Sequence, residues 1–167
     1  MTKLEDPDLF SYFVSKVEEP IFQKYLAGDE YTVDAVVGKR GTVFAIVPKK
    51  RLEMRGGSTY KAVTVHHPEI EAITTRILDL LKPTGPLNIQ YKIDEENGSA
   101  NVMEINPRFS STLCLTVDAG INSVEILLQD AFGEPTNSYY SFKEGLCMLR
   151  YWENIVLRSS ELIGERS

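Results

Sequence analysis

The chain has 167 residues, enough for one domain with a hydrophobic core of its own. Its net charge of −6 argues against non-specific nucleic-acid binding, which requires a basic face. No apolar run reaches the roughly 18 residues of a membrane helix, and the charged N-terminus lacks a signal-peptide core. Cys114 and Cys147 are the only cysteines, so we expect reduced thiols in a cytoplasmic protein. With only His66 and His67 as histidines, we expect no zinc site.

The hydrophobic pattern predicts hairpins that are followed by single helices. In chain order we expect a helix from Asp6 to about Val17, strands at 31–37 and 42–47, a basic loop at 49–60, a strand at 62–65, a helix at 68–81, strands at 87–93 and 100–106, helices at about 111–119 and 123–132, and a final strand within 142–157. This order predicts an α+β fold, with helices packed on one face of a largely antiparallel sheet.

The most informative segment is Met103-Glu104-Ile105-Asn106-Pro107-Arg108. On a strand, Glu104 and Asn106 point to the same face, with the Arg108 guanidinium just beyond the proline. Oxygen ligands suit Mg²⁺, which shares its coordination shell with substrate phosphates, and arginine can bind phosphate oxygens in a bidentate manner. The segment is therefore either a solvated strand face or part of a site for Mg²⁺ and a nucleotide triphosphate.

The hairpin that contains this segment adds a third candidate ligand. If its register is centred on Asn97, Gln90 lies directly across from Glu104 on the same face. Gln90, Glu104 and Asn106 then form a polar cluster. A slip of one residue would place Gln90 and Glu104 on opposite faces, so the prediction depends on register.

Other polar segments leave two interpretations open. Glu30, Thr32 and Asp34 share a strand face that is either a solvated edge or a carboxylate site for hydroxyls such as those of ribose. His66 and His67 are interpreted as helix-start residues before Pro68.

Two further segments lie next to the candidate site in the sequence. The basic loop is either solvated or a binding loop, with Gly56 and Gly57 allowing close approach of the backbone. Which of Lys49, Arg51 and Arg55 would contact a ligand is left open. Residues 110–112 either cap a helix or face a substrate.

Taken together, three segments resemble the ATP-grasp ligases, particularly their carbamoyl-phosphate-synthase-like branch. They are residues 22–34 (FQKYLAGDEYTVD), 85–90 (GPLNIQ) and 103–108 (MEINPR). The steps of fourteen residues from Gln90 to Glu104 and seven from Gln23 to Glu30 fit the spacing of that family. The resemblance covers about residues 18–133.

The resemblance implies a role for each matching position. Gln23, Lys24, Tyr25 and Leu26 would form the hinge that lines the adenine, and Glu30 would bind the ribose. Gln90, Glu104 and Asn106 would hold Mg²⁺, or Mn²⁺, against the phosphates of ATP. Arg108 would stabilise the transferring phosphoryl group, and the loop with Gly56 and Gly57 would close over the triphosphate.

The resemblance also implies the domain organisation: residues 1–22 form a helix and lead-in, 23–157 the C-terminal lobe of an ATP-grasp fold, and 158–167 a flexible tail. The glycine-rich lobe that precedes the hinge in the family does not match residues 1–22. We therefore expect it in the same parent protein or in a separate subunit, and we expect the chain alone to bind ATP weakly and to be inactive.

The expected function is that of the C-terminal lobe of an ATP-dependent carboxylate–amine ligase that acts through an acyl phosphate. Its partners would be ATP, a small carboxylate and an amine, with neither nucleic acid nor membrane; a homodimer is possible. The identity of the carboxylate is left open. The alternatives are a non-catalytic nucleotide-binding or assembly module with a retained ATP-grasp fold, and a structural α+β domain with solvated strand faces.

Overall fold

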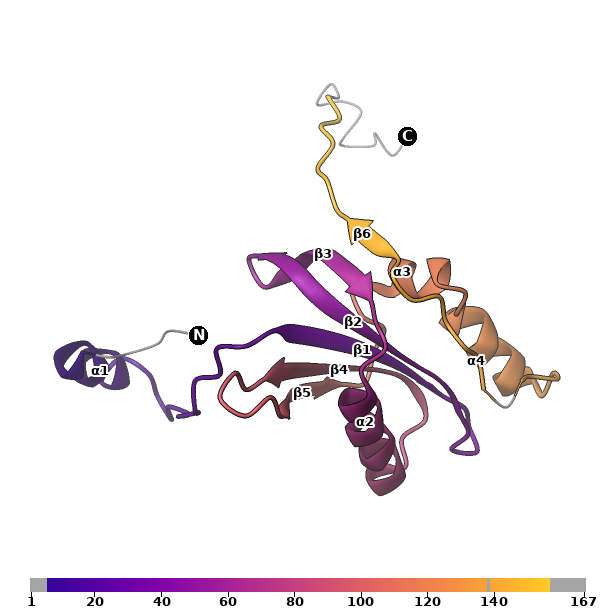
Figure 1. Cartoon of the computed structure of the whole chain (residues 1–167), viewed down its shortest axis with the longest axis horizontal. Coiled ribbons are helices and arrows are strands. Elements are labelled where there is room, and N and C mark those ends of the chain that lie inside the picture. The colour runs from indigo at the N-terminus through magenta and orange to yellow at the C-terminus, as the bar shows by residue number, and fades with distance from the viewer. Residues whose placement is uncertain (1–5, 138, 157–167) are drawn as a thin grey trace, which may run out of the picture.

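The structure is a computed structural model that describes residues 6–137 and 139–156. Its centre is a six-stranded antiparallel sheet with the strand order β5-β4-β1-β2-β3-β6 (Figure 1). The strands are β1 (Glu30–Val37), β2 (Val43–Arg55), β3 (Ser58–Thr64), β4 (Gly85–Ile93), β5 (Ala100–Asn106) and β6 (Cys147–Leu149). The helices are α1 (Pro7–Val14), α2 (Pro68–Leu81), α3 (Leu113–Asp118) and α4 (Ser123–Phe132). The α+β class and the antiparallel sheet are confirmed.

Strand β1 lies in the interior of the sheet and not at an edge. It pairs with β2 on one side and with β4 on the other over its full length. Every residue after Glu30 in this strand is buried. The interpretation of Glu30, Thr32 and Asp34 as a solvated edge is therefore wrong, because hairpin pairing with β2 and non-local pairing with β4 cover both sides of the strand.

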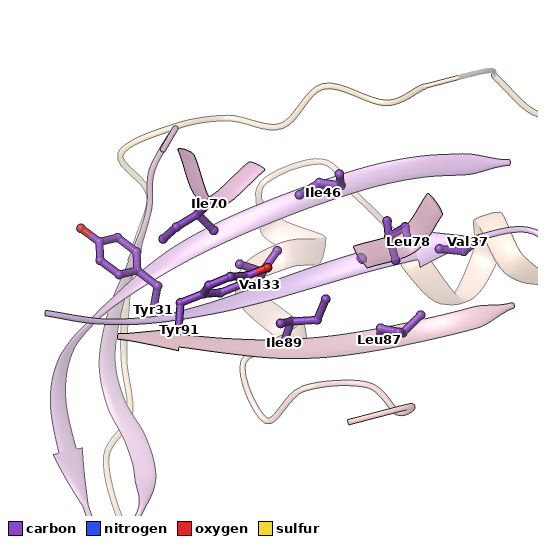
Figure 2. Packing of buried hydrophobic residues seen from close by; sticks show 10 residues of the cluster. Tyr31, Val33, Val37, Ile46, Ile70, Leu78, Leu87, Ile89 and Tyr91 are labelled. Atoms are coloured by element: carbon purple, nitrogen blue, oxygen red, sulfur yellow. The ribbon is translucent and has the colours of Figure 1, made fainter. Parts of the chain in front are cut away.

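One face of the sheet packs against α2. Alternate residues of β1, among them Val33 and Val37, meet Ile70 and Leu78 of the helix in one buried cluster (Figure 2). The helix has its apolar residues at helical spacing, so one stripe of side chains reaches the sheet. Tyr91 is 1% exposed, and its hydroxyl lies 2.6 Å from Thr74 Oγ1. This cluster positions β4 against β1.

The opposite face packs against α3 and α4 at one end and remains polar along the rest. Val36 and Val47 join Ile126 of α4, together with Ala119 and Ile121, in a second buried cluster. Helices therefore lie over both faces, whereas the sequence predicted them on one (Figure 1). The hydrophobic pattern of a helix shows that it has an apolar stripe but not which face of the sheet it covers.

Three elements differ from their predicted extents. Helix α1 ends at Val14 instead of about Val17, buries none of its residues and lies apart from the sheet (Figure 1). Residues 49–60 are not a loop: β2 continues to Arg55 and β3 begins at Ser58. The final strand spans only Cys147–Leu149, and Leu157, the last residue of its predicted range, lies outside the described residues.

Three structural observations outside the site relate to the sequence analysis. Both cysteines are free thiols. His67 is the N-cap of α2, where its Nδ1 accepts a hydrogen bond from the Ile70 backbone N–H at 3.4 Å, so its interpretation as a helix-start residue is confirmed. Within residues 6–137 and 139–156, no helix is long and apolar enough to cross a membrane.

Candidate Mg²⁺–nucleotide site

Gln90, Glu104 and Asn106 lie together on the polar face of the β4–β5 hairpin. Gln90 is paired across the strands with Glu104, as the predicted register requires. Its Nε2 donates to Glu104 Oε1 at 2.5 Å, and Asn106 Nδ2 donates to the same oxygen at 2.8 Å. Glu104 is exposed, so the cluster opens to solvent. Gln90 therefore lies across from Glu104 as predicted, and one carboxylate and two side-chain amides converge at one place. The register centred on Asn97 does not extend to the turn, however, because Tyr91 pairs with Val102 and the register shifts by one residue between Gln90 and Tyr91.

Arg51 of β2 connects this cluster with Glu30. Its Nη1 donates to Glu30 Oε2 and to Gln90 Oε1, each at 3.2 Å. Its Nε donates to Thr59 Oγ1 at 2.9 Å. The Arg51 side chain is 7% exposed, whereas the Glu30 side chain with which it pairs is 27% exposed. The guanidinium therefore occupies the space between the predicted ribose-binding residue and the predicted metal ligands.

The predicted hinge passes close to the same end of the sheet. Lys92 Nζ donates to Glu30 Oε1 at 3.2 Å and lies 5.7 Å from the centre of the Tyr25 ring. Lys24 Nζ forms an ion pair with Asp94 at 2.9 Å, and it holds the pKa of that carboxyl below its usual range. Gln23 is exposed and Leu26 is half-buried.

Gly28 allows the hinge to approach β4. A Cβ atom at this position would lie 2.1 Å from the backbone oxygen of Ile93, which is closer than any real Cβ contact. The backbone N–H of Ile93 donates to the Asp29 oxygen at 2.9 Å. The segment that contains the hinge is therefore attached to the same β4–β5 hairpin that carries the candidate metal ligands.

Gly56 and Gly57 form the turn between β2 and β3. Their φ angles are +55° and +79°, values that suit a two-residue hairpin turn and favour glycine. Arg51 Nη2 donates to the Gly57 oxygen at 2.8 Å, which ties the turn to the site. The turn geometry explains both glycines without a ligand, and their approach to a triphosphate stays a prediction.

Arg108 and the polar residues after it differ sharply in burial. Arg108 is exposed, and its Nη1 donates to the oxygen of Phe109 at 3.0 Å. Ser110 and Thr112 are buried, whereas Ser111 is exposed. Thr112 is the N-cap of α3 but makes no side-chain capping bond. Of residues 110–112, therefore, only Ser111 is open to a ligand, and simple helix capping does not explain the other two.

Of the three basic residues that the sequence left open, Lys49 is excluded from direct contact with a ligand. Its side chain is 0% exposed and its Nζ lies 2.5 Å from Asp34 Oδ2. Burial lowers the pKa of this ammonium group, while the charge of Asp34 opposes the shift. Arg55 is exposed and lies over the Tyr60 ring at 4.2 Å. Arg51 is thus the residue of this group that reaches the candidate metal ligands.

The cluster fits Mg²⁺ by the chemistry of its donors. Glu104 supplies a carboxylate, and Gln90 and Asn106 each carry an amide oxygen, all of them hard oxygen ligands. No group of three or more acidic, histidine or cysteine side chains able to hold a metal occurs among the described residues. With a single carboxylate, the cluster suits a Mg²⁺ ion that takes its remaining oxygens from phosphates and water.

Two contributors to the site escaped the sequence analysis. Lys92 was assigned only to a strand, yet it pairs with Glu30. Thr59 fell within a predicted loop, but it is buried on β3 and accepts the Arg51 Nε–H. The alternation of polar residues in β4, where Asn88, Gln90 and Lys92 share one face, was the available signal for Lys92.

Comparison with solved structures shows the class of fold. The chain is similar to N5-carboxyaminoimidazole synthetase from Staphylococcus aureus complexed with ADP, with a TM-score of 0.60 at 15% identity, over 72% of this chain and 34% of that one. It is also similar to the phosphoribosylaminoimidazole carboxylase ATPase subunit from Aquifex aeolicus, with a TM-score of 0.58 at 22% identity, over 81% and 43%. The fold is that of the ATP-grasp proteins.

Sequence comparison identifies the family. A family model described as ATP-grasp in the biosynthetic pathway with Ter operon matches residues 16–153, and the chain belongs to this ATP-grasp family. The chain is also 30% identical, over 135 residues, to the carbamoyl phosphate synthase large chain of Thermoanaerobacter pseudethanolicus. That match covers 75% of this chain and 12% of the relative, so the chain spans a small part of that relative's length.

Proposed function

We propose that this chain is the C-terminal, Mg²⁺–ATP-binding lobe of an ATP-dependent carboxylate–amine ligase, of carbamoyl-phosphate-synthase-like type. The observation that carries the proposal is the convergence of Gln90, Glu104 and Asn106, with Arg51 alongside. Membership of the ATP-grasp family supports it independently. The remaining nucleotide contacts would come from a further lobe, in the same parent protein or in another subunit.

Each part of the site has a proposed role in binding ATP. The hinge at residues 23–26 would line the adenine, and Glu30 would accept hydrogen bonds from the ribose hydroxyls. Lys92 would hold that carboxylate in its orientation, because its ammonium group already pairs with Glu30. The adenosine would then lie beside the hinge, with its phosphates directed toward Glu104.

At the phosphate end, Glu104, Gln90 and Asn106 would hold Mg²⁺. When bound, the ion would neutralise negative charge on the phosphate oxygens. Arg51 lies between Glu30 and Gln90 and would bind phosphate oxygens along the path from ribose to metal. Arg108 would stabilise the charge of the transferring phosphoryl group, since phosphoryl transfer depends mostly on positioning and electrostatic stabilisation.

The reaction proposed for the complete enzyme has two steps. A carboxylate oxygen of the acceptor attacks the γ-phosphorus of ATP, the bond to the β-phosphate oxygen breaks, and ADP and an acyl phosphate form. An amine then attacks the acyl carbon, phosphate leaves, and the nitrogen loses a proton. The described residues that would take part in the first step are those that hold the triphosphate and Arg108.

The test is thermal unfolding with millimolar ATP or ADP, with and without Mg²⁺. A ligand that binds only the native state raises the melting temperature, even when it binds weakly. We expect a nucleotide shift that depends on Mg²⁺ and disappears in Glu104→Ala. The matched control is Glu95→Ala, which removes an exposed carboxylate from the turn of the same hairpin and should retain the shift.

An unchanged shift in Glu104→Ala would show that the metal-site assignment is wrong. An equal loss of the nucleotide shift in Glu104→Ala and Glu95→Ala would show that the shift depends on the net charge of the hairpin and not on a metal ligand at Glu104. Isothermal titration should give an affinity weaker than low micromolar, because a further lobe would supply the other contacts. Low-micromolar affinity for Mg²⁺–ATP would contradict the proposal that this lobe is only part of the site.

A further inference from the structure

A buried ion pair joins β1 and β2 to the chain segment that follows β5. Lys49 Nζ lies 2.5 Å from Asp34 Oδ2, with the lysine side chain 0% exposed and the aspartate side chain 7% exposed. Thr116 Oγ1 donates to the same aspartate oxygen at 2.6 Å and accepts from Lys49 Nζ at 2.8 Å. Ser110 Oγ also donates to Asp34 Oδ2, at 3.0 Å. The β1–β2 hairpin and a segment about 80 residues further along the chain therefore meet at one carboxylate oxygen.

Further bonds close this group into a network. Lys49 Nζ lies 3.4 Å from the backbone oxygen of Thr112 and 3.4 Å from Ser110 Oγ. The hydroxyl oxygens of Ser110 and Thr112 are 3.0 Å apart. All five side chains are buried, and Asp34 Oδ1 has no hydrogen-bond partner within the described part of the chain. The network is thus closed to solvent and dense in hydrogen bonds.

A buried ion pair of this kind is a poor source of stability. Removing two charges from water costs free energy that their attraction only partly offsets, and apolar side chains of similar volume often stabilise as much. A hydrogen-bonded network does, however, admit few arrangements, because each partner must keep its distance and direction. The contribution that apolar packing would not reproduce is therefore the defined position of residues 110–116.

The network shares a face and two cross-strand rows with the candidate metal ligands. The rows are Lys49–Thr32–Gln90–Glu104 and Asp34–Asn88–Asn106. Between the two groups, Asn88 Nδ2 donates to Thr32 Oγ1 at 2.5 Å, and both side chains are buried. The ion pair is thus linked to the metal ligands through the adjacent, paired strands β1, β4 and β5.

Arg108 is located between two attachment points of the chain. On one side, its backbone N–H donates to the oxygen of Asn106 at 2.8 Å, at the end of β5. On the other side, Ser110 is held by Asp34. The Arg108 side chain is exposed, and its one described hydrogen bond goes to the neighbouring Phe109 oxygen. Its position therefore depends on where these two attachments hold the backbone.

We propose that Asp34 and Lys49, acting through Ser110 and Thr116, are positioning residues that hold Arg108 next to the metal ligands. This inference rests on the proposed function, in which Arg108 faces the transferring phosphoryl group. It assigns a role in that site to two charged residues that no ligand can reach. It also explains why Ser110 and Thr112 are buried instead of facing a substrate.

The test compares two buried threonines on opposite faces of the sheet. Thr116→Val removes a hydroxyl from the network, and Thr116→Ser should restore it. Thr74→Val is the matched control, because Thr74 is also 0% exposed and bonds to Tyr91 in the other core. Two quantities are measured on the full chain: amide hydrogen exchange of residues 108–113, and the Mg²⁺-dependent thermal shift with ATP.

We expect Thr116→Val to speed exchange at residues 108–113 roughly tenfold, about the factor that corresponds to one lost hydrogen bond. It should also lose most of the Mg²⁺–ATP shift. Thr116→Ser should recover the slow exchange and the Mg²⁺–ATP shift. Thr74→Val should lower the melting temperature by a similar amount but change neither the exchange of residues 108–113 nor the shift. If Thr116→Val does not fold, Ser110→Ala, which truncates a less buried side chain, serves in its place.

Two results would overturn the inference in different ways. If Thr116→Val and Thr74→Val have the same exchange rates at residues 108–113 and the same ATP shift, the network has only a structural role, while the proposed function stands. If the unaltered chain shows no Mg²⁺-dependent ATP shift, the proposed function fails, and the role for Arg108 fails with it.

Discussion

The two faces of the central sheet are built from the same strands but differ in chemistry. On one face, Val33 and Ile89 pack with α2 in an apolar cluster whose few hydroxyls, such as those of Tyr91 and Thr74, bond to each other. On the other face, between Glu30 and Asn106, charged and amide side chains bond to one another. The first face supplies apolar burial, while the second concentrates groups that could bind phosphate and metal.

The difference shows how one strand can contribute both to the apolar core and to a binding site. Successive side chains of β1 alternate between the faces, so Val33 and Ala35 enter the apolar core while Thr32 and Asp34 enter the polar layer. Substitutions on the two faces should therefore separate stability from ligand binding. The following predictions test that separation, from the largest expected effect to the smallest.

Truncation in the apolar core should have the largest effect on stability. Ile89 is 0% exposed, and Ile89→Ala should lower the free energy of unfolding by about 2–5 kcal/mol, through lost burial and the cavity left behind. Urea denaturation followed by circular dichroism measures it. Glu104→Ala, on the opposite face, should leave the free energy within about 0.5 kcal/mol, as for most surface substitutions. A comparable loss in both variants would contradict the division between the faces.

Arg51→Met should affect both properties. It leaves Glu30 and Gln90 without their shared donor, so we expect a loss of about 1–3 kcal/mol of stability. The Mg²⁺–ATP shift should disappear as well. Arg51→Lys should recover part of the stability but little of the shift, since an ammonium group cannot reproduce the planar fork of the guanidinium. Full recovery of the shift by lysine would show that only the charge matters.

Gly28→Ala should displace the hinge. The added methyl group would meet the Ile93 oxygen, and the expected cost is about 1 kcal/mol because the exposed hinge can move away. The free energy of ATP binding should fall by more than the free energy of unfolding. Melting temperatures over a series of ATP concentrations would measure the loss of affinity. Ala27→Ser, at the preceding exposed position, is the control. Unchanged ATP binding in Gly28→Ala would separate this segment from the nucleotide site.

Lys24→Met should have the smallest effect, and that effect should depend on pH. Lys24 holds the pKa of Asp94 below its usual range, so the stability from this pair is present above the ordinary carboxyl pKa of about 4. It is lost as the pH falls through the lowered pKa of the folded state. Melting temperatures of the two proteins should therefore differ at pH 7 and converge toward pH 2. A difference that persists at pH 2 would contradict an electrostatic role for the pair.

The sequence by itself determined the type and order of most elements and the members of the candidate metal site, but not that residues 49–60 belong to paired strands. Alternation along two adjacent strands and the Asn97-Gly98 turn led to the prediction that Gln90 lies across from Glu104, since hairpin pairing is local. The pairing is observed, but it is reached through a register shift between Gln90 and Tyr91 that the sequence pattern did not predict. The start of α2 was also predicted from a local pattern, Pro68 and the apolar residues that follow it. The roles of these residues in binding a nucleotide remain predictions.

Only the tertiary structure decided what surrounds that cluster. The pairing of β1 with β4 joins residues about 60 positions apart, as in the bond from Lys92 to Glu30, and no local pattern specifies it. A second non-local contact, between this face and the segment that carries Ser110 and Thr116, encloses Lys49 beside Asp34, so that this candidate ligand contact is a buried residue. Burial and charge pairing depend on which elements meet across the sheet, and that choice is made by the packing of the whole chain.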